Sequence, residues 1–351
     1  WHFWMGEDDA VNQYGTNAPR AVLGREWNRT FASGQKITRT LRIYNDTQHA
    51  DPLTFEWKLR FGGKDIAGAK TTIKVPPGEY MQVPLALTMP KAMGTNSRLD
   101  GALILTLTVG GKPAFSDRKP LTVIETTTPP AALRTVQPAQ LALFDPGKKV
   151  SRFLTSRGIR FSEIGSLAAL PKTAAVLVIG PDALDASASA SSRLAAWASS
   201  GKRIIVLDQK NPLRYQGLPV PIESTDNTGR TAHIEDASHP VCTGLRSEDF
   251  WTWGINVPVY RSAYGKPALG ARSLVQCHAR LANSALIEIP VDTGLMLLCQ
   301  LTVGTNIERS APAQRLLLNL LHRAITYKRT LRSVRSFVGA DPQFARALNA
   351  V

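Results

Sequence analysis

The segment from Glu248 to Trp253 holds residue types that bind carbohydrate. Phe250, Trp251 and Trp253 offer aromatic faces that stack on the apolar faces of sugar rings. The neighbouring carboxylates of Glu248 and Asp249 accept hydrogen bonds from sugar hydroxyls. Aromatic residues at this spacing also pack beneath long loops as part of a core. The segment is therefore a candidate carbohydrate contact, with core packing as the alternative interpretation.

Four further residues carry groups that can hold a metal ion, namely His233, Glu235, Asp236 and His239. Their spacing matches no standard zinc or calcium pattern, and His239 followed by Pro240 favours a turn. The sequence therefore predicts neither a metal site nor a bound cofactor.

The three cysteines are widely separated. Cys242, Cys277 and Cys299 form no C-x-x-C pair, which argues against a zinc ribbon or a thioredoxin-like site. We expect all three to be small buried side chains.

Length and composition limit the architecture that must position these residues. The chain has 351 residues, 43% of them hydrophobic, and a formal net charge of +15. That length exceeds one ordinary domain and the apolar content supports real cores, so we expect a multidomain globular protein. No apolar run approaches the roughly 18 residues that span a bilayer. The chain begins at Trp1, so we expect a targeting peptide already removed or a start within a longer protein.

Residues 20–126 show the period of β-strands. Between Leu53 and Phe61, and again from Leu103 to Val109, apolar residues alternate with polar ones, and each run stops at a Gly-Gly pair. About seven such strands with no helical pattern predict an antiparallel β-sandwich of the immunoglobulin kind. Residues 1–19 show neither period and are interpreted as an arm or the end of a preceding domain.

A linker and a different architecture follow. Residues 127–140 are rich in Pro and Thr, and we expect none of them to be buried. Residues 141–327 alternate short, doubly apolar strands with helical segments, which predicts an α/β domain with a mostly parallel, flavodoxin-like sheet. Strands over 285–290 and 294–301 are expected as an antiparallel pair at the sheet edge, and residues 315–327 as a closing amphipathic helix.

Residues 328–351 form a basic tail. The basic residues that gather there and just before it are Arg323, Lys328, Arg329, Arg332, Arg335 and Arg346. Such a tail attracts nucleic acid, anionic lipid or acidic polysaccharide, or it is a solvated terminal helix. No RNA- or DNA-binding motif accompanies it, so nucleic acid is not an expected partner.

Several segments resemble a known family. They are LFDPGKKVSRFLTSRGIRF, AAVLVIGPDAL, SHPVCTGLRSEDFWTWG, and LMLLCQL followed by APAQRLLLNLLHRA. They are similar to the class I glutamine-amidotransferase-like domain in the degenerate form found at the C-terminal end of bacterial glycoside hydrolases such as the beta-galactosidases of family 2. The stretch NAPRAVLGREWNRTFASGQKITRTLRIYNDT resembles the sandwich that follows the catalytic barrel in such enzymes. The resemblance spans roughly residues 17–327.

The resemblance implies that the amidotransferase machinery is vestigial. An active member carries a Cys on a tight elbow and a later His and Glu, because a thiolate needs an adjacent base. Here the elbow position is Asp208-Gln209 and the later position is Cys299-Gln300. We therefore expect no glutamine hydrolysis at these four residues. The turn Gly180-Pro181-Asp182 lies at the same sheet edge and is either a plain turn or a small-ligand contact.

No sugar-cleaving barrel is encoded either, since a barrel with paired carboxylates needs some 250 residues. The first hypothesis is a non-catalytic accessory portion of a secreted or periplasmic bacterial glycoside hydrolase. Its partners would be a catalytic barrel, on the same or a separate chain, and further copies of this chain. Two alternatives stay open: a stand-alone binder of carbohydrate or acidic polysaccharide, and an enzyme with an unrecognised site.

Overall fold

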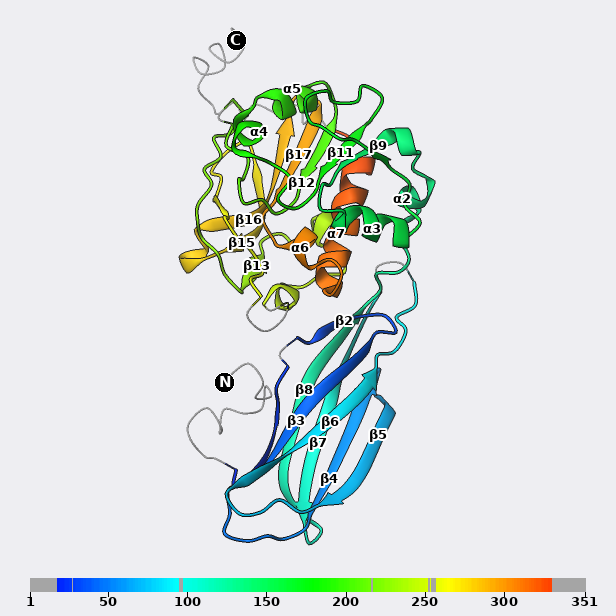
Figure 1. Cartoon of the computed structure of the whole chain (residues 1–351), viewed down its shortest axis with the longest axis vertical. Coiled ribbons are helices and arrows are strands. Elements are labelled where there is room, and N and C mark those ends of the chain that lie inside the picture. Colours follow the sequence, from blue (N-terminus) through cyan, green and yellow to red (C-terminus); the bar gives the residue numbers. More distant parts are fainter. Residues whose placement is uncertain are drawn as a thin grey trace, which may run out of the picture.

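The structure is a computed structural model, and Figure 1 shows two parts arranged along the long axis of the molecule. It describes residues 18–329 except Trp27, residues 95–96, Gln216, Thr252 and residues 254–256. The amino-terminal part, residues 18–125, is built of strands. The carboxy-terminal part, residues 126–329, holds a large sheet with helices. Residues 1–17 of the arm predicted over 1–19 lie outside the described residues, as does most of the basic tail, including Arg332, Arg335 and Arg346.

The strands of the amino-terminal part form where apolar and polar residues alternate. Strand β4 (Leu53–Phe61) pairs with β5 (Lys64–Ile73) through Gly62-Gly63, and β7 (Arg98–Val109) pairs with β8 (Lys112–Ile124) through Gly110-Gly111. All four glycines have positive φ, which these two-residue turns require. Both hairpins predicted from the sequence are confirmed. The remaining strands are β1 (Arg20–Gly24), β2 (Thr30–Ala32), β3 (Lys36–Asn45) and β6 (Glu79–Thr88).

These strands make two sheets over a common core. An antiparallel sheet has the order β1-β3-β6, and a mixed sheet has the order β2-β8-β7-β4-β5, in which β2 and β8 are parallel. Buried side chains from both sheets, such as Ile43 and Leu105, belong to one hydrophobic cluster. Two short strands, β1 and β2, were not predicted, because neither is long enough to show a period of two.

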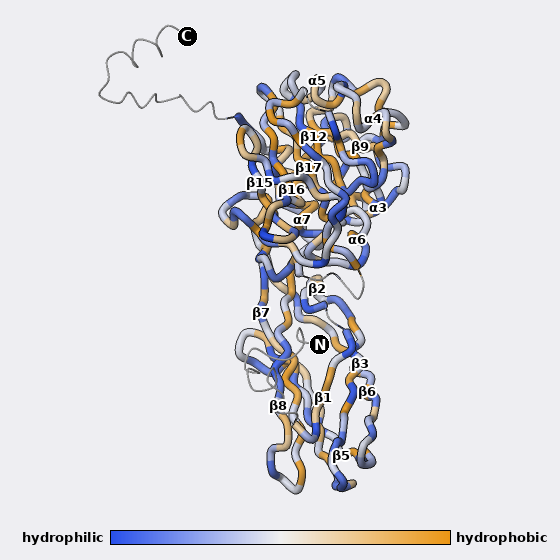
Figure 2. The backbone as a smooth tube through the Cα atoms, turned by 90° about the vertical axis from the view of Figure 1, so that its left-hand side faces the viewer, coloured by the Kyte–Doolittle hydropathy of each residue, from blue (hydrophilic) through white to orange (hydrophobic). Residues whose placement is uncertain are grey.

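The carboxy-terminal part contains a nine-stranded mixed sheet. Its order is β10-β9-β11-β12-β17-β16-β15-β13, with β14 (Tyr264–Gly265) paired to β16. The bounds of the strands on this path are β9 (Leu141–Phe144), β10 (Ser162–Glu163), β11 (Val176–Ile179), β12 (Arg203–Val206), β13 (Ala232–Ile234), β15 (Arg272–Cys277), β16 (Asn283–Val291) and β17 (Gly294–Cys299). Figure 2 shows hydrophobic residues along the central strands, as expected for strands buried on both faces.

The sheet corrects two predictions. It is parallel only from β10 to β17 and antiparallel from β17 to β13, so "mostly parallel" overstates its character. The pair β16 and β17 is antiparallel as predicted, but it lies inside the sheet, because β15 and β13 continue beyond it. The short strands β13 and β15 carry polar residues such as His233 and Gln276, which obscure their pattern in the sequence.

The helices also differ from prediction in detail. The small residues over 187–200 predict one helix, but the structure has two short helices, α4 (Ala186–Ala190) and α5 (Arg193–Ser199), because the chain is extended at Ser191. The sequence also predicts a helix near 148–157, and α3 (Lys149–Ser156) confirms it. A short α6 (Val303–Asn306) precedes the final helix α7 (Ala311–Thr326).

Helix α7 is buried on nearly all sides rather than along one stripe. It lies between β12 of the sheet, the short helix η3 (Pro240–Cys242), and strands β2 and β8 of the amino-terminal part. Its polar residues find partners within the protein: the Asn319 amide donates to the carbonyls of Val241 at 2.9 Å and Thr243 at 2.8 Å. The amphipathic pattern therefore underestimated the burial of α7. Strands β2 and β8 of the amino-terminal part cover the face that the pattern assigns to solvent.

The predicted linker is partly buried. Residues 131–135 form helix α2 (Ala131–Thr135), and the side chains of Leu133 and Val136 lie in the main cluster of the carboxy-terminal part. The expectation that nothing in this segment is buried was wrong, because Leu133 lies within α2, Val136 directly follows it, and α2 packs against α7. A further short helix, η2 (Pro138–Gln140), leads into β9. Among the described helices, none is both long and apolar enough to cross a membrane.

Candidate functional site

The residues expected at the vestigial amidotransferase position do come together. Asp208 and Gln209 follow β12, and Asp182 follows the neighbouring parallel strand β11, so all three lie at the same edge of the sheet. Gln300 follows β17, the next strand along. Asp182 has a φ of +54°, a left-handed backbone conformation that is typical of a tight turn. The sheet topology thus assembles one polar cluster, which we name the edge cluster: Asp182, Asp208, Gln209, Arg261, Cys299, Gln300, Gly304 and Thr305.

The carboxylate of Asp208 is fully buried and its oxygens are occupied. Its Oδ1 accepts a hydrogen bond of 2.9 Å from the Gly304 N–H, and its Oδ2 accepts from the Thr305 hydroxyl. The Arg261 guanidinium lies 3.1 Å from Oδ2 and 2.7 Å from Asp182 Oδ1. Burial raises the pKa of Asp208 above its ordinary value, although these donors and Arg261 oppose the shift.

Two hydrogen bonds join Gln209 and Gln300. The Gln209 N–H donates to Gln300 Oε1 at 2.9 Å, and the Gln300 amide donates to the Gln209 carbonyl at 3.2 Å. The Gln209 amide also donates to the Gly180 carbonyl at 2.6 Å. Cys299 is buried, and its thiol lies 3.8 Å from the Leu301 carbonyl. Burial, and then the nearby Asp208, raise the pKa of this thiol.

This arrangement is a buried network of hydrogen bonds. A nucleophile needs an accessible atom beside a base, whereas Asp208 and Cys299 are both buried and Cys299 is held in its neutral thiol form. The hydrogen bonds join the ends of β11, β12 and β17 to α6. The edge cluster therefore resembles a closed polar network more than a reaction site.

The segment 248–253 lies at the junction of the two parts. Asp249 is buried, and its carboxylate accepts hydrogen bonds from Thr30 at 2.9 Å and pairs with Arg98 at 2.6 Å, both from the amino-terminal part. The same carboxylate caps the short helix η4 (Ser247–Phe250) by accepting from the Arg246 N–H at 2.9 Å. Asp249 therefore joins the two parts through an ion pair withdrawn from water.

The aromatic residues of this segment have different environments. Phe250 and Trp253 are buried in the main cluster, and Trp253 donates from Nε1 to the Asp249 carbonyl at 2.7 Å. Trp251 is half-buried, with the Arg29 guanidinium 5.0 Å from its ring centre, and Glu248 is half-buried as well. Of the five candidate carbohydrate contacts, Trp251 and Glu248 are thus the ones with exposed surface.

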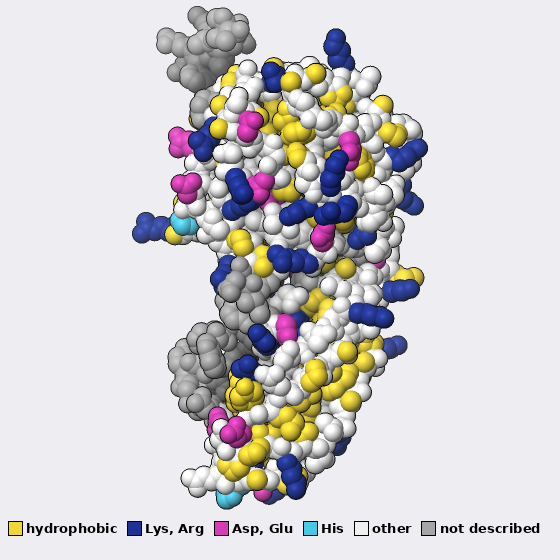
Figure 3. Space-filling view, viewed as in Figure 1, with side chains coloured by type: hydrophobic (Ala, Val, Ile, Leu, Met, Phe, Trp, Pro, Cys, Tyr) yellow, Lys and Arg dark blue, Asp and Glu magenta, His cyan; other side chains and the backbone are white. Residues whose placement is uncertain are grey.

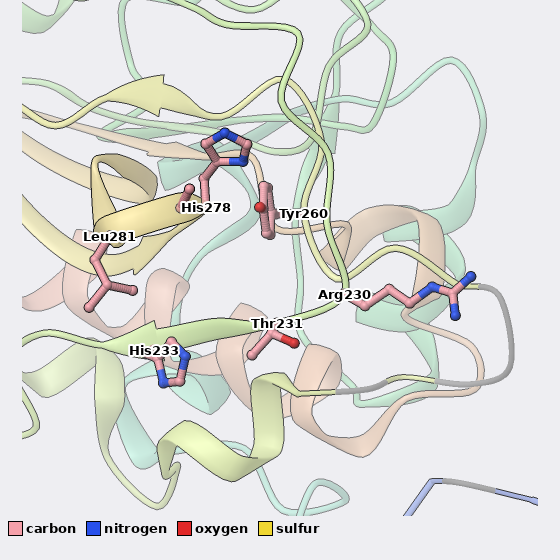
Figure 4. Close-up of a pocket in the computed structure, with 7 residues that line it drawn as sticks. Arg230, Thr231, His233, Tyr260, His278 and Leu281 are labelled. Carbon is pink, nitrogen blue, oxygen red and sulfur yellow. The ribbon is translucent and has the colours of Figure 1, made fainter. Parts of the chain in front are cut away.

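A pocket of about 310 Å³ lies at β13 and the turn that follows β15, and Figure 4 shows its lining. The lining residues are Arg230, Thr231, His233, Tyr260, His278, Ala279 and Leu281. Burial is the main cause that raises the pKa of Tyr260 to about 12, so its phenol stays protonated. Among these residues, only His233 carries a signal in the sequence, as one of the candidate metal ligands. The others come from three segments whose meeting is decided by the pairing of β13 with β15.

Three of the four candidate metal ligands have charged partners elsewhere in the protein. Glu235 pairs with Lys266 at 2.7 Å, Asp236 pairs with Arg272, and His239 Nε2 lies 3.3 Å from Glu288. Within the part of the chain that the structure describes, no group of three or more His, Cys, Asp or Glu residues could hold a metal ion.

No protein-family model matches the chain, and no curated protein matches it by sequence. Among solved structures, the chain has weak similarity to an exo-beta-1,4-mannosidase from Opitutaceae bacterium strain TAV5, with a TM-score of 0.36 and 12% identity over 56% of this chain. That match spans 37% of the mannosidase chain.

Two further structures are similar over smaller portions. A FixG-related protein from Vibrio parahaemolyticus has 18% identity and a TM-score of 0.21, over 30% of this chain and 96% of that one. The sporulation control protein Spo0M from Bacillus subtilis has 14% identity and a TM-score of 0.24, over 39% of this chain and 55% of that one.

Proposed function

We propose that this chain is a non-catalytic structural portion of a bacterial glycoside hydrolase, secreted or periplasmic. In this proposal an immunoglobulin-like sandwich and a degenerate amidotransferase-like domain support a catalytic barrel and mediate contact between subunits. The observation that carries the non-catalytic role is the environment of Asp208. At the position where the resembled family places its nucleophile, a fully buried carboxylate is occupied by Gly304, Thr305 and Arg261.

The surface of the amino-terminal part supports a structural role. Figure 3 shows hydrophobic side chains gathered on the face of this part that the view presents. Ile66 on β5 and Tyr80 on β6 are each 46% exposed, and nearly all of β5 is exposed. Strand β5 ends its sheet, and among the described strands only β4 pairs with it. An unpaired edge beside exposed apolar side chains is a surface that suits another polypeptide.

Enzyme assays test the non-catalytic role. The purified chain is incubated with nitrophenyl glycosides and, separately, with glutamine. We expect neither nitrophenol nor glutamate to be released above the level given by the Asp208→Asn variant. Turnover that the variant abolishes would contradict the proposal.

Light scattering after gel filtration tests the subunit contact. We expect the chain to self-associate and Ile66→Glu to shift it toward the monomer. Leu269→Glu is the matched control, because Leu269 is 82% exposed but lies in the other part of the molecule. A chain that is monomeric at all concentrations would remove self-association from the proposal.

A further inference from the structure

Three of the four edge strands in the amino-terminal part carry features that discourage further pairing. Within the described residues, the two sheets end at β1, β6, β2 and β5. Strands β1 and β2 have only five and three residues, and β6 holds Pro84, which has no N–H to donate. Short strands and proline are among the devices by which natural sheets prevent edge-to-edge association. The sequence thus protects these three edges.

Strand β5 lacks both features. It runs for ten residues without a proline, and nine of the ten are exposed. Its middle, Ala67-Gly68-Ala69, is uncharged and small, so another strand can approach it closely. Among the described strands only β4 pairs with it, which leaves N–H and C=O groups unused along its other side. Figure 1 shows β5 at the right-hand edge of the amino-terminal part. Strand β5 is therefore the edge open to a further strand.

A bulge limits the portion of β5 that can pair regularly. The register shifts between Leu59, opposite Ala67, and Arg60, opposite Asp65, so Ile66 is the extra residue. A bulge bends its strand and interrupts the ladder. The regular portion is therefore residues 67–73, and Lys70 is its only charged residue.

Symmetry and charge then select the register of two such strands. Two antiparallel copies of one strand, related by a two-fold axis, place one residue opposite itself. Lys70 is excluded from the axis, because like charges directly opposite each other are destabilising. With Thr71 on the axis, Lys70 lies diagonally from Lys74 of the second copy. With Ala69 on the axis, it lies diagonally from Asp65 of the second copy instead, so Ala69 is favoured.

Pairing at β5 also covers apolar surface. Ala69 lies opposite Trp57 of β4, which is only half-buried. Ile66 is 46% exposed. A strand laid along β5 removes apolar surface of this kind from water, which contributes about 25 cal/mol per Å². Backbone hydrogen bonds and apolar burial therefore act together at this edge.

From these observations we propose that two copies of the chain join through β5, antiparallel and with Ala69 on the two-fold axis. The five-stranded sheets of the two copies then form one continuous sheet. The inference rests on the subunit contact of the proposed function and specifies its site and register. Because each copy has a formal net charge of +15, added salt should strengthen the contact by screening the repulsion between them.

Disulfide formation in the full chain tests the register. Ala69→Cys should give a disulfide-linked dimer under mild oxidation, because opposite Cα atoms in an antiparallel pair are about 4.5–5.5 Å apart, within the range of a disulfide. Thr71→Cys and, on the other sheet, Ala86→Cys are the controls, since both positions are exposed as well. Neither should cross-link more than the native chain, whose three cysteines are buried.

Light scattering at several protein concentrations tests the contact itself. Ala69→Lys should weaken self-association at least about tenfold, because it sets two ammonium groups opposite each other at the axis. Ala86→Lys is the matched control, because it adds the same charge at an exposed position of β6 and should leave self-association unchanged. Circular dichroism of each variant confirms that the fold is retained.

The other outcomes overturn the inference in different ways. Cross-linking of Thr71→Cys in place of Ala69→Cys would overturn the register. If the native chain self-associates but Ala69→Cys gives no cross-link and Ala69→Lys has no effect, the contact lies elsewhere, and the subunit contact of the proposed function survives without β5. A chain that stays monomeric removes both.

Discussion

At the scale of single residues, buried ionisable groups are stabilised by specific partners. Glu288 on β16 is buried between His239 and the Arg323 guanidinium of α7, which donates to both carboxylate oxygens at 2.9 and 2.8 Å. Burial alone would raise the pKa of Glu288, but the hydrogen bonds and positive charge lower it to about 2. The carboxylate thus holds the final helix on the sheet.

The depressed pKa of Glu288 predicts a pH-dependent contribution to stability. With a folded pKa near 2 against an ordinary 4.5, this contribution is complete above about pH 4.5 and is lost as pH falls toward 2. Glu288→Gln should therefore lower the free energy of unfolding by about 3 kcal/mol at pH 7 and by much less near pH 2. Urea denaturation at both pH values measures this.

The control for Glu288 is Glu163→Gln. Glu163 pairs with Lys148 at 2.6 Å, but both side chains are about half exposed. Such surface pairs contribute less than about 1 kcal/mol. If the two variants lost equal free energy of unfolding, the buried pair would contribute no more to stability than the surface pair, which would contradict the prediction.

The three free thiols are expected to be unreactive in the folded protein. Burial raises the pKa of Cys242 and of Cys277 to about 12, and that of Cys299 rises as well. Because the thiolate is the reactive form, Ellman's reagent at about pH 8 should label none of them rapidly. All three should react in guanidinium chloride. Rapid labelling of one thiol in native buffer would contradict this prediction.

At the scale of elements, close backbone approach fixes the hairpin between β16 and β17. A Cβ on Gly294 would overlap the carbonyl oxygens of Ala198, in the last turn of helix α5, and of Lys202, directly before β12. Backbone atoms cannot move aside as a flexible side chain can. The glycine therefore allows the helix layer to reach the sheet at this point.

Gly294→Ala should destabilise the protein by about 3 kcal/mol, because the overlap forces the hairpin or the helix to shift. Thermal unfolding followed by circular dichroism measures the change. Gly147→Ala is the control, since a Cβ there meets nothing within 4 Å and the residue is not in the positive-φ region. It should change stability by no more than about 0.5 kcal/mol. Similar values for the two variants would contradict the packing argument.

At the scale of the whole molecule, the two parts are joined by polar contacts as well as by helix α7. Besides the pair of Asp249 and Arg98, the Thr30 hydroxyl of the amino-terminal part donates to Asp249 at 2.9 Å. These groups are buried or half-buried. Polar contacts of this kind fix the orientation of two surfaces, because each requires a defined geometry.

Asp249→Ala should loosen this junction. Removal of the carboxylate leaves Arg98 without its buried partner, which costs about 3 kcal/mol. We expect hydrogen exchange to increase in β2, in β8 and in the helix η4. Asp65→Ala is the control, because Asp65 pairs with Arg60 within the amino-terminal part and its side chain is 38% exposed. Unchanged exchange at the junction in Asp249→Ala would show that α7 alone joins the parts.

The sequence by itself determined the elements whose side chains repeat. Alternation in Leu53–Phe61 and from Leu103 to Val109 predicted β4 and β7, because a strand with one buried face must alternate. Continuous apolar runs predicted β11, β12 and β17. The order along the chain also placed Asp182, Asp208 and Gln209 at one edge, since parallel strands end together.

Only the tertiary structure decided the rest. The burial of α7 and of Leu133, the interior place of β16 and β17, and the role of Asp249 at the junction all depend on which surfaces meet. The pocket of His233, Tyr260 and His278 also depends on the tertiary structure, because its segments meet only when β13 pairs with β15. A residue pattern records the local period and polarity of the chain. Contacts between distant segments depend on the sum of all packing, which no single stretch of sequence contains.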